Sequence, residues 1–301
     1  MVDKGVVSMV GIIGLGAMGT AYARRLIDSG LDVCGYDPSG EARERLTAMG
    51  GDATLSADEV ARRCSVIVSA LPTRGAFDDL LSVLKANPTG SGWVIDTNTL
   101  PGDVKLAASD DLAAGGWVML DCAVSGNPAM VLDDTYSFYV SGEGRHADAV
   151  RTVIGALATK VFDVGAFGNA TKAKLIINHL LMIHNAAAAE AITLAAKAGL
   201  EPERLYELVV ASGGSSRMFE VRGKWMVTGE YPKANVYEIL LDKDGVAIAD
   251  LARSLRHPVP LFANAYQMHM IGLAQGWHEY DASSMEAVYA NLSGHTRVPG
   301  A

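Results

Sequence analysis

A lysine and an asparagine stand four residues apart in the most apolar stretch of the sequence. Lys174 and Asn178 lie within 168–199, a run of Ala, Leu, Ile and Met that begins and ends at glycine and is typical of a long buried helix. At about 100° per residue, these two side chains and that of Asn185 fall within about 40° of one another on one helix face. Because burial lowers the pKa of a lysine, such a residue suits general acid/base catalysis in a partly dry crevice. Helix capping or an internal hydrogen bond is the alternative interpretation.

A glycine-rich turn near the start of the chain has the spacing of a dinucleotide-binding loop. The buried strand predicted at 9–13 leads into GLGAMG at 14–19, a helix follows, and the next predicted strand, 31–36, precedes Asp37. The three glycines permit a tight turn, a close approach of pyrophosphate and close packing of helix on strand. The cofactor-binding residues predicted here are Gly14, Leu15, Gly16, Ala17, Met18, Gly19 and Asp37.

The acidic residue after the second strand bears on the choice of cofactor. Asp37 would accept hydrogen bonds from the adenosine ribose and would repel a 2′-phosphate. No arginine stands among the next three residues, Pro38, Ser39 and Gly40. The sequence therefore predicts NAD in preference to NADP. A glycine turn that binds no ligand is the alternative.

Strands and helices alternate over the first half of the chain. The apolar runs end in polar loops at 71–73, 97–101 and 121–127, and such loops lie at the carboxyl edge of a parallel sheet, where ligands bind. The pattern predicts an α/β fold with a doubly wound parallel sheet of the Rossmann type. The further strands are expected at 65–70, 92–96, 117–121, 136–141 and 160–164.

After about residue 165 the pattern becomes all-helical. We therefore expect an NAD-binding domain at 1–166 and a helical domain for substrate binding and dimerisation at 167–301, joined by the long helix. The other helices of the second domain are expected at 202–212, 215–227, 236–255, 260–276 and 283–291.

Composition and charge argue against several classes of protein. The 301-residue chain has a net charge of −9 and no Lys/Arg-rich run, which argues against nucleic-acid binding. His179, His184 and Glu190 interrupt the apolar helix further and argue against a membrane span. The seven histidines lack metal-ligand spacing, so no metal site is predicted. Three widely spaced cysteines and a first segment without an apolar signal core favour a cytoplasmic protein.

Five features in a fixed order resemble the 3-hydroxyisobutyrate (β-hydroxyacid) dehydrogenase family. They are GLGAMG, Leu71-Pro72, D-x-x-V-S-G at 121–126, the glycine, lysine and asparagine of 168–178, and Lys243-Asp244. The resemblance covers nearly the whole chain. The second domain resembles most the threonate dehydrogenase branch, which takes a four-carbon sugar acid, at 184–191, 218–220 and 229–231.

The resemblance implies a Rossmann domain and a second domain of the 6-phosphogluconate dehydrogenase type, assembled as a homodimer or homotetramer. It implies hydride transfer between a nicotinamide cofactor and a small hydroxy acid, either a 3-hydroxy acid or a four-carbon sugar acid. Lys174 would be the general acid/base and Asn178 its partner at the reacting oxygen, whereas Lys172 projects about 160° away from Lys174. The other implied contacts are Ser125, Gly126, Asn127 and Asp244 for the substrate, and Leu71, Pro72, Thr99 and Lys243 for the cofactor.

Several residues depart from the family pattern, mostly around the substrate loop. Asp134 belongs to an acidic turn that is either solvated or reshapes the mouth of the pocket. Asn127 favours a hydroxylated or amino-substituted substrate over one that bears a methyl group. The reaction class stands and the substrate is left open. An imine reductase on the same fold and a non-catalytic NAD-binding protein are the alternatives, and the pair Lys174 and Asn178 argues against both. The departing residues are Asn98, Ala123, Asn127, Asp134, Ala170 and Ile177, which replace Ser, Pro, Gly, Gly, Gly and a polar residue.

Overall fold

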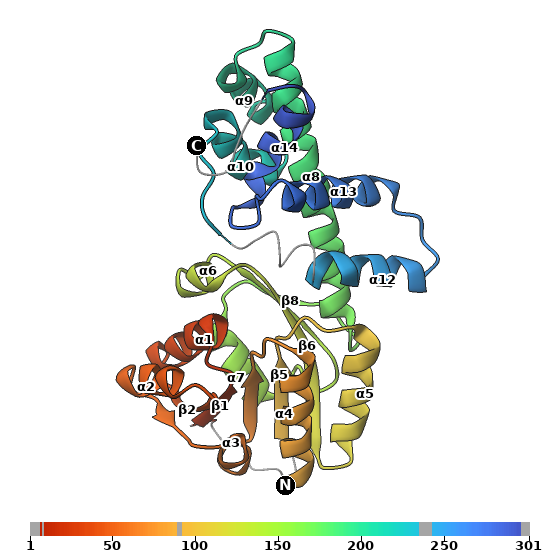
Figure 1. Ribbon diagram of the computed structural model, residues 1–301. Helices are drawn as coiled ribbons and strands as arrows, with labels where there is room; N and C mark the ends of the chain where they lie inside the picture. The colour runs from red at the N-terminus through yellow and green to blue at the C-terminus, as the bar shows by residue number, and fades with distance from the viewer. Residues whose placement is uncertain (1–6, 8, 89–91, 235–242, 296–301) are drawn as a thin grey trace. The chain divides into compact units, whose positions relative to one another are not determined.

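The chain divides into two compact units, Met1–Lys174 and Leu175–Ala301 (Figure 1). The first unit is a sheet covered by helices, and the second is all-helical. The boundary predicted at 166–167 lies between the last strand and the long helix, whose residues up to Lys174 belong to the first unit. The computed structural model describes residues 7, 9–88, 92–234 and 243–295.

The first unit contains an eight-stranded sheet with the strand order β3-β2-β1-β4-β5-β6-β7-β8. Neighbouring strands are parallel except β6 and β7, which are antiparallel. The order reverses between β1 and β4, and α/β folds bind ligands at such a switch point. The predicted Rossmann sheet is confirmed. Its strands are β1 (Met9–Ile13), β2 (Asp32–Tyr36), β3 (Asp52–Ala53), β4 (Val66–Ser69), β5 (Gly92–Asp96), β6 (Trp117–Ser125), β7 (Ser137–Ser141) and β8 (Val161–Asp163).

The sheet differs from the prediction in three places. β3 is a two-residue strand that no apolar run indicates. β6 continues from the predicted end at residue 121 to Ser125, because its last residues pair with β7 from Ser141 back to Ser137. This pairing reverses β7, so the sheet is mixed and not wholly parallel.

Helices cover both faces of the sheet (Figure 1). On one face the buried side chains include Tyr22 of α1 and Val153 of α7, and on the other Phe77 of α4 and Leu112 of α5. Strands buried on both faces are apolar throughout, which explains why the sequence shows them as continuous apolar runs. The helices of this unit are α1 (Ala17–Asp28), α2 (Gly40–Ala48), α3 (Ala57–Arg63), α4 (Arg74–Ala86), α5 (Gly102–Ala113), α6 (Pro128–Leu132) and α7 (Asp148–Leu157).

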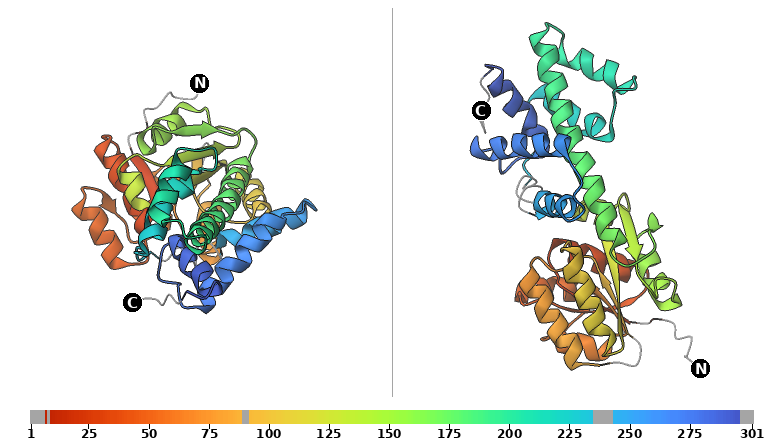
Figure 2. Two further views of the ribbon diagram at one scale, coloured as in Figure 1. Left: turned by 90° about the horizontal axis from the view of Figure 1, so that it is seen from above. Right: turned by 90° about the vertical axis from the view of Figure 1, so that its right-hand side faces the viewer.

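The core of the second unit forms around α8 (Asn169–Lys197), a continuous helix of 29 residues (Figure 2). Met182 and Ile192 of α8 share a buried cluster with Phe219 and Met285. The predicted helix 236–255 is found in part as α12, and residues 235–242 lie outside the described residues. The other elements are α9 (Pro202–Val210), α10 (Arg217–Thr228), α12 (Val246–Ser254), α13 (Pro260–Ala274), the 3-10 helix η2 (Ala282–Ser284) and α14 (Met285–Leu292).

Among the described residues, α8 is the one helix that is long and apolar enough to cross a membrane by length and composition. Asn178, Asn185 and Thr193 are nevertheless buried along it, beside the apolar residues of the core. Polar side chains buried in this way are typical of a helix that packs against protein.

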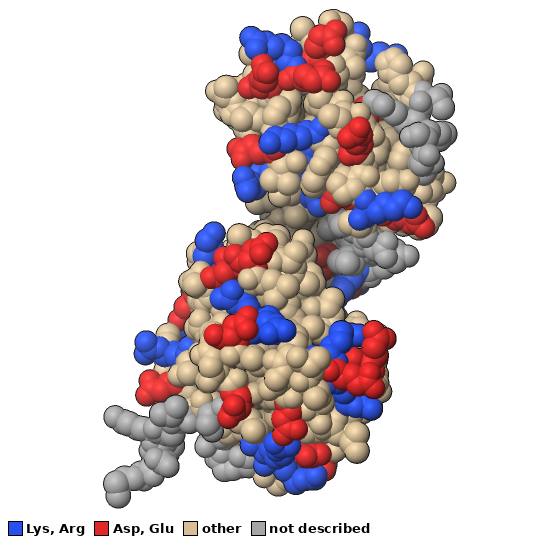
Figure 3. All heavy atoms as spheres, turned by 90° about the vertical axis from the view of Figure 1, so that its left-hand side faces the viewer, with Lys and Arg blue, Asp and Glu red and all other residues tan. Residues whose placement is uncertain are grey.

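Charges of both signs are mixed on the surface. Figure 3 shows Asp and Glu side chains interspersed with Lys and Arg on the face that it draws, and the described residues of that face carry no broad basic patch. A basic stripe is the usual footprint of nucleic-acid binding. The three cysteines, Cys34, Cys64 and Cys122, are buried and free.

Candidate active site

The glycine turn follows β1 and lies beside the end of β4, and its three glycines have different surroundings. Gly14 has a φ of +94°, and a Cβ there would lie 2.2 Å from the carbonyl oxygen of Ala70. A Cβ at Gly19 would lie 1.8 Å from the carbonyl oxygen of Gly14. A Cβ at Gly16, in contrast, would meet no described atom within 4 Å. The fold therefore requires the first and third glycines, and the second borders open space.

The N-terminus of α1 opens onto this space. Gly16 is the N-cap residue, and among the described residues no side chain caps the helix. The first turn carries no acidic residue, so its N–H groups and the positive end of its dipole suit an anion. The turn thus fits the pyrophosphate of a dinucleotide.

Asp37 follows β2 and is tied to the glycine turn. Its carboxylate accepts hydrogen bonds from the N–H groups of Leu15, at 2.8 Å, and Ser39, at 2.9 Å. Arg43 of α2 donates to the carbonyl oxygens of Asp37, at 2.6 Å, and Pro38, at 3.0 Å. The sequence pattern did not predict this arginine, because it lies one helical turn beyond the three residues that follow Asp37. A positive charge therefore lies against the backbone of the residue that is predicted to select NAD.

Asn98 joins the loops that follow β4 and β5. Its amide oxygen accepts a hydrogen bond from the N–H of Leu71 at 2.5 Å, and its amide nitrogen donates to Ser69 Oγ at 3.2 Å. Pro72, the next residue of the first loop, is exposed. The amide nitrogen of Asn98 also donates to Asp96 Oδ1. The serine of the family pattern has one O–H group and could not make both donations. This departure from the pattern thus has a structural role.

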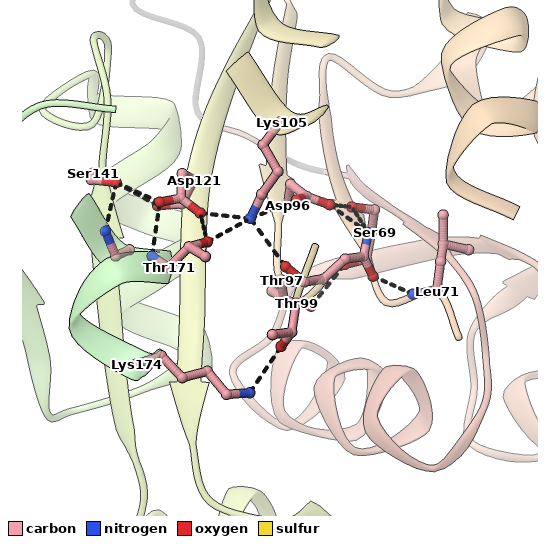
Figure 4. A network of polar contacts seen from close by, with 12 residues as sticks. Ser69, Leu71, Asp96, Thr97, Thr99, Lys105, Asp121, Ser141, Thr171 and Lys174 are labelled. Atoms are coloured by element: carbon pink, nitrogen blue, oxygen red, sulfur yellow. Dashed lines mark hydrogen bonds and ion pairs between the residues drawn. The ribbon is translucent and has the colours of Figure 1, made fainter. Parts of the chain in front are cut away.

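Lys174 is half-buried, and its Nζ donates a hydrogen bond to Thr99 Oγ1 at 3.0 Å (Figure 4). Lys172 is exposed, so the two lysines face different directions, as the helical period predicts. Thr99 follows β5, whose end lies at the same edge of the sheet as the glycine turn. The first unit therefore places a titratable amine at its ligand-binding edge.

Asn178 lies one turn after Lys174 on α8 and belongs to the second unit. Its amide nitrogen donates a hydrogen bond to Asp244 Oδ2 at 2.8 Å, and both side chains are buried. Asp244 lies in a π-helical turn at 243–245, directly before α12, and Lys243 in the same turn is exposed. Such turns are frequent at functional sites.

Ser125, Gly126 and Asn127 connect β6 to α6. Ser125 is half-buried, and a Cβ at Gly126 would lie 2.7 Å from the Cβ of Tyr136. Asn127 is the N-cap of α6, and its amide oxygen accepts a hydrogen bond from the N–H of Met130 at 3.0 Å. This hydrogen bond fixes the side chain at the start of the helix. Because an amide has two N–H groups and a second lone pair on its oxygen, the predicted contact of Asn127 with the substrate stays a prediction.

Asp134 has a structural role as well. It has a φ of +54°, a conformation that glycine adopts without strain and aspartate tolerates better than most residues. Its carboxylate lies 3.2 Å from Arg25 Nη2 and accepts a hydrogen bond from the N–H of Thr159 at 3.2 Å. Burial raises the pKa of this carboxyl, but the Thr159 hydrogen bond and the Arg25 charge outweigh it and hold the pKa below its usual value. The carboxylate of Asp134 is thus held by Arg25 and Thr159, whereas Asp133 is exposed.

A second lysine of the first unit was not expected. Lys105 of α5 is fully buried, and its Nζ lies 2.8 Å from Asp96 Oδ2 and 2.6 Å from Asp121 Oδ1. The sequence contains one indication that Lys105 is buried, because its position falls on the same helical stripe as the buried residues Ala108 and Leu112. A charge on a buried stripe requires a buried partner of opposite sign.

These features together define an NAD(P)-dependent dehydrogenase. They are a Rossmann sheet, a turn that suits pyrophosphate, an aspartate for the ribose and a lysine at the same edge of the sheet. Residues 9–165 match the family described as the NAD binding domain of 6-phosphogluconate dehydrogenase. Residues 168–289 match the family described as NAD-binding of NADP-dependent 3-hydroxyisobutyrate dehydrogenase. The chain belongs to the 3-hydroxyisobutyrate dehydrogenase family and is an NAD(P)-dependent hydroxyacid dehydrogenase.

Known dehydrogenases are similar to the chain over nearly its whole length, which confirms the family and its threonate branch. An L-threonate dehydrogenase of Cupriavidus necator is 33% identical over 288 residues, which cover 94% of this chain and 96% of that protein. Human mitochondrial 3-hydroxyisobutyrate dehydrogenase is 29% identical over 289 residues, covering 92% and 85%. The crystal structure of a 3-hydroxyisobutyrate dehydrogenase from Salmonella typhimurium has a TM-score of 0.78 at 30% identity, covering 92% and 98%. A Bacillus cereus imine reductase, at 18% identity and a TM-score of 0.64 over 94% and 99%, shares the fold alone.

Proposed function

We propose that this protein oxidises a small hydroxy acid reversibly, with NAD as its cofactor. The observation that carries this proposal is the hydrogen bond from Lys174 to Thr99, at the sheet edge that also carries the glycine turn. The bound cofactor supplies the hydride acceptor. The protein then has to hold the acid, orient the reacting carbon and move the hydroxyl proton.

Lys174 is the proposed general acid/base. It takes the proton of the substrate hydroxyl during oxidation and returns it during reduction. The Thr99 hydroxyl orients its amine. Asn178, on the same helix face, holds the reacting oxygen with the amide N–H that its hydrogen bond to Asp244 does not use.

A four-carbon polyhydroxy acid is the leading candidate substrate, followed by a 3-hydroxy acid. L-threonate dehydrogenases from Cupriavidus necator and Haemophilus influenzae are 33% and 30% identical to the chain, over 94% of it in both cases. The Ser125 hydroxyl and the Gly126 N–H are short donors close to the backbone, which suit a carboxylate. Lys174 must reach the oxygen on the reacting carbon. Only a few atoms therefore fit between that carbon and the carboxylate of the substrate.

NAD is the proposed cofactor in preference to NADP. Two backbone N–H groups fix the carboxylate of Asp37, which would accept hydrogen bonds from the ribose hydroxyls and repel a 2′-phosphate. Arg43 would favour a 2′-phosphate, but its guanidinium is bound to two backbone carbonyls. The carboxylate therefore dominates the selection.

Absorbance at 340 nm tests the proposed reaction. The protein is assayed with NAD and with NADP against L-threonate, 3-hydroxyisobutyrate and glycerate, and with the reduced cofactors against a cyclic imine. The proposal predicts turnover of a hydroxy acid, with NAD the better cofactor. Turnover of the imine alone would favour the reductase alternative, and cofactor binding without turnover of any substrate would favour the non-catalytic one.

We also propose that two copies of the chain assemble through the second unit. Leu194, Leu208 and Leu292 are 67%, 52% and 59% exposed there. A hollow of about 350 Å³, lined in part by Ile192 and Ala290, adjoins these helices. These leucines belong to α8, α9 and α14, and an assembly through those helices would cover them. In a homo-oligomer the same surface serves both partners.

A further inference from the structure

A continuous network of buried polar side chains crosses four neighbouring strands and reaches the first turn of α8 (Figure 4). Lys105 lies at its centre, since its Nζ contacts Asp96 Oδ2 at 2.8 Å and Asp121 Oδ1 at 2.6 Å. The same nitrogen donates to the carbonyl oxygen of Asn98 at 3.1 Å and lies 3.4 Å from Thr171 Oγ1. The side chains of Lys105 and of both aspartates have an exposed fraction of 0%.

On one side, the network holds the loop that carries Thr99. Lys105 binds the carbonyl oxygen of Asn98, the residue directly before Thr99. The side chain of Asn98 in turn binds Ser69 Oγ and the N–H of Leu71. The backbone is therefore fixed immediately before the hydroxyl that accepts the hydrogen bond of the proposed catalytic lysine.

On the other side, the network holds the start of α8. Asp121 accepts hydrogen bonds from the N–H of Thr171 at 2.9 Å and from its hydroxyl at 2.6 Å. Ser141 Oγ accepts one from the N–H of Ala170 at 3.1 Å. The first N–H groups of a helix have no partner within the helix, so these side chains act as its cap. Lys174 lies three residues after Thr171, which corresponds to about 4.5 Å along the helix axis.

We propose that Lys105 is a positioning residue that links the two supports of the contact between Lys174 and Thr99. The inference rests on the proposed function of Lys174. Misplacement of a reacting group by about 1 Å can cost about 10²-fold in rate, so a rigid link between the two supports acts on kcat. Lys105 is not a catalytic residue, because a fully buried side chain bound to two aspartates cannot touch the substrate.

The charges of the network explain why the link holds at neutral pH. Burial alone would lower the pKa of Lys105, but the carboxylates of Asp96 and Asp121 raise it above its usual value. Burial would raise the pKa of Asp121, but Lys105 and the hydrogen bonds from Thr171 hold it below its usual range. The ammonium therefore stays protonated beside an ionised Asp121, and buried charges persist when they are paired and hydrogen-bonded in this way.

Substitution of Thr171 tests the link by turnover. Thr171→Val removes the hydroxyl that binds Asp121 at almost constant volume, and should lower kcat on the best hydroxy acid by about 10–100-fold. The Kd of NAD and the KM should change by less than about twofold. Thr171→Ser restores the hydroxyl and should restore kcat.

The matched control is Thr193→Val, the same change at another buried position of α8, which should leave kcat unchanged. A wild-type kcat in Thr171→Val, even with a lower Tm, would overturn the proposal.

Hydrogen exchange provides a test that needs no turnover. In Lys105→Met, amide exchange at 170–174 should become faster by about tenfold or more, while exchange at 193–197 stays the same. Unchanged exchange at 170–174 would overturn the link. If Lys105→Met does not fold, the same comparison in Thr171→Val decides. If the wild type turns over no hydroxy acid, the proposed function is wrong. The exchange rates at 170–174 still show whether Lys105 holds the start of α8.

Discussion

Lys172 and Lys174 are two residues apart, yet one is exposed and the other is half-buried against Thr99. The helical period alone predicts these different directions. It does not predict Thr99 as the partner, because that residue lies 75 positions away and the contact depends on the order of the strands. The catalytic role of Lys174 stays a prediction.

The ion pairs of Lys105 could not be predicted from the sequence around that residue. Its stripe on α5 indicates burial, but its partners come from β5 and β6, and their proximity follows from the sheet register that pairs Asp96 with Asp121. A sequence does not show that register before the strand order is known. The departures at Asn98, Asn127 and Asp134 were visible, but their structural roles depend on contacts between separate elements.

Replacement of Asp37 should change the choice of cofactor. Asp37→Ala removes the charge that repels a 2′-phosphate and leaves Arg43 beside the ribose site. The ratio of kcat/KM for NADP to that for NAD should rise by about tenfold or more, which corresponds to about 1.4 kcal/mol. The double variant Asp37→Ala/Arg43→Ala should lose much of this gain. A wild type that prefers NADP would contradict the assignment of Asp37.

The carboxylate of Asp134 should stabilise the fold in a pH-dependent way. Its folded-state pKa is lowered, so its contribution is present above the unfolded pKa of about 3.9 and is lost as pH falls through the folded value. Asp134→Asn, which also tolerates a positive φ, should cost about 1 kcal/mol at pH 7, and the difference should be smaller at about pH 3. Asp133→Asn, at the exposed neighbour, is the control. Denaturant unfolding at both pH values measures this, and a pH-independent difference would contradict the ion-pair account.

At the scale of elements, β6 and β7 show why strand ends are hard to predict. Residues 121–125 look like the loop after a strand, since they carry the polar motif of the family. They extend β6 instead, because β7 pairs with them in antiparallel register. That partner comes from residues 137–141, beyond α6, and the intervening turn gives no signal for the reversal.

The glycine turn gives a prediction that separates fold from ligand binding. Gly19→Ala places a Cβ 1.8 Å from the Gly14 carbonyl oxygen and should destabilise the protein. Gly16→Ala meets no described atom within 4 Å, and φ at Gly16 is −63°, so the apo protein should keep its Tm. Its Kd for NAD should rise by about tenfold or more, because the methyl group occupies the space for the pyrophosphate. Thermal unfolding and calorimetry measure both effects, and an unchanged Kd in Gly16→Ala would argue against a cofactor at this turn.

At the scale of the whole molecule, the change from alternating to all-helical pattern is enough to predict two units of different class. The identity of the substrate is harder to predict, because it depends on a few side chains around the ends of β5 and β6. Those side chains include Asn127, which departs from the family pattern. Similarity over the whole chain therefore supports the reaction class more strongly than any one substrate.

The exposed leucines predict self-association. The double variant Leu194→Lys/Leu292→Lys puts two charges on the exposed apolar surface of the second unit and should shift a dimer toward monomer in light scattering. Leu55→Lys is the matched control, because Leu55 is 82% exposed but belongs to the first unit. A wild type that is monomeric at micromolar concentration would contradict the proposed assembly.

A comparison of Lys174→Ala with Lys172→Ala in the 340 nm assay shows whether Lys174 moves the substrate proton. We expect Lys174→Ala to lower kcat by about 10²–10⁴-fold, the usual contribution of a positioned acid or base. Calorimetry should give the same Kd for NAD in both variants, because neither lysine belongs to the glycine turn that is predicted to bind the cofactor. Lys172→Ala should retain nearly wild-type kcat. Equal losses in the two variants, or a greater loss in Lys172→Ala, would contradict the assignment.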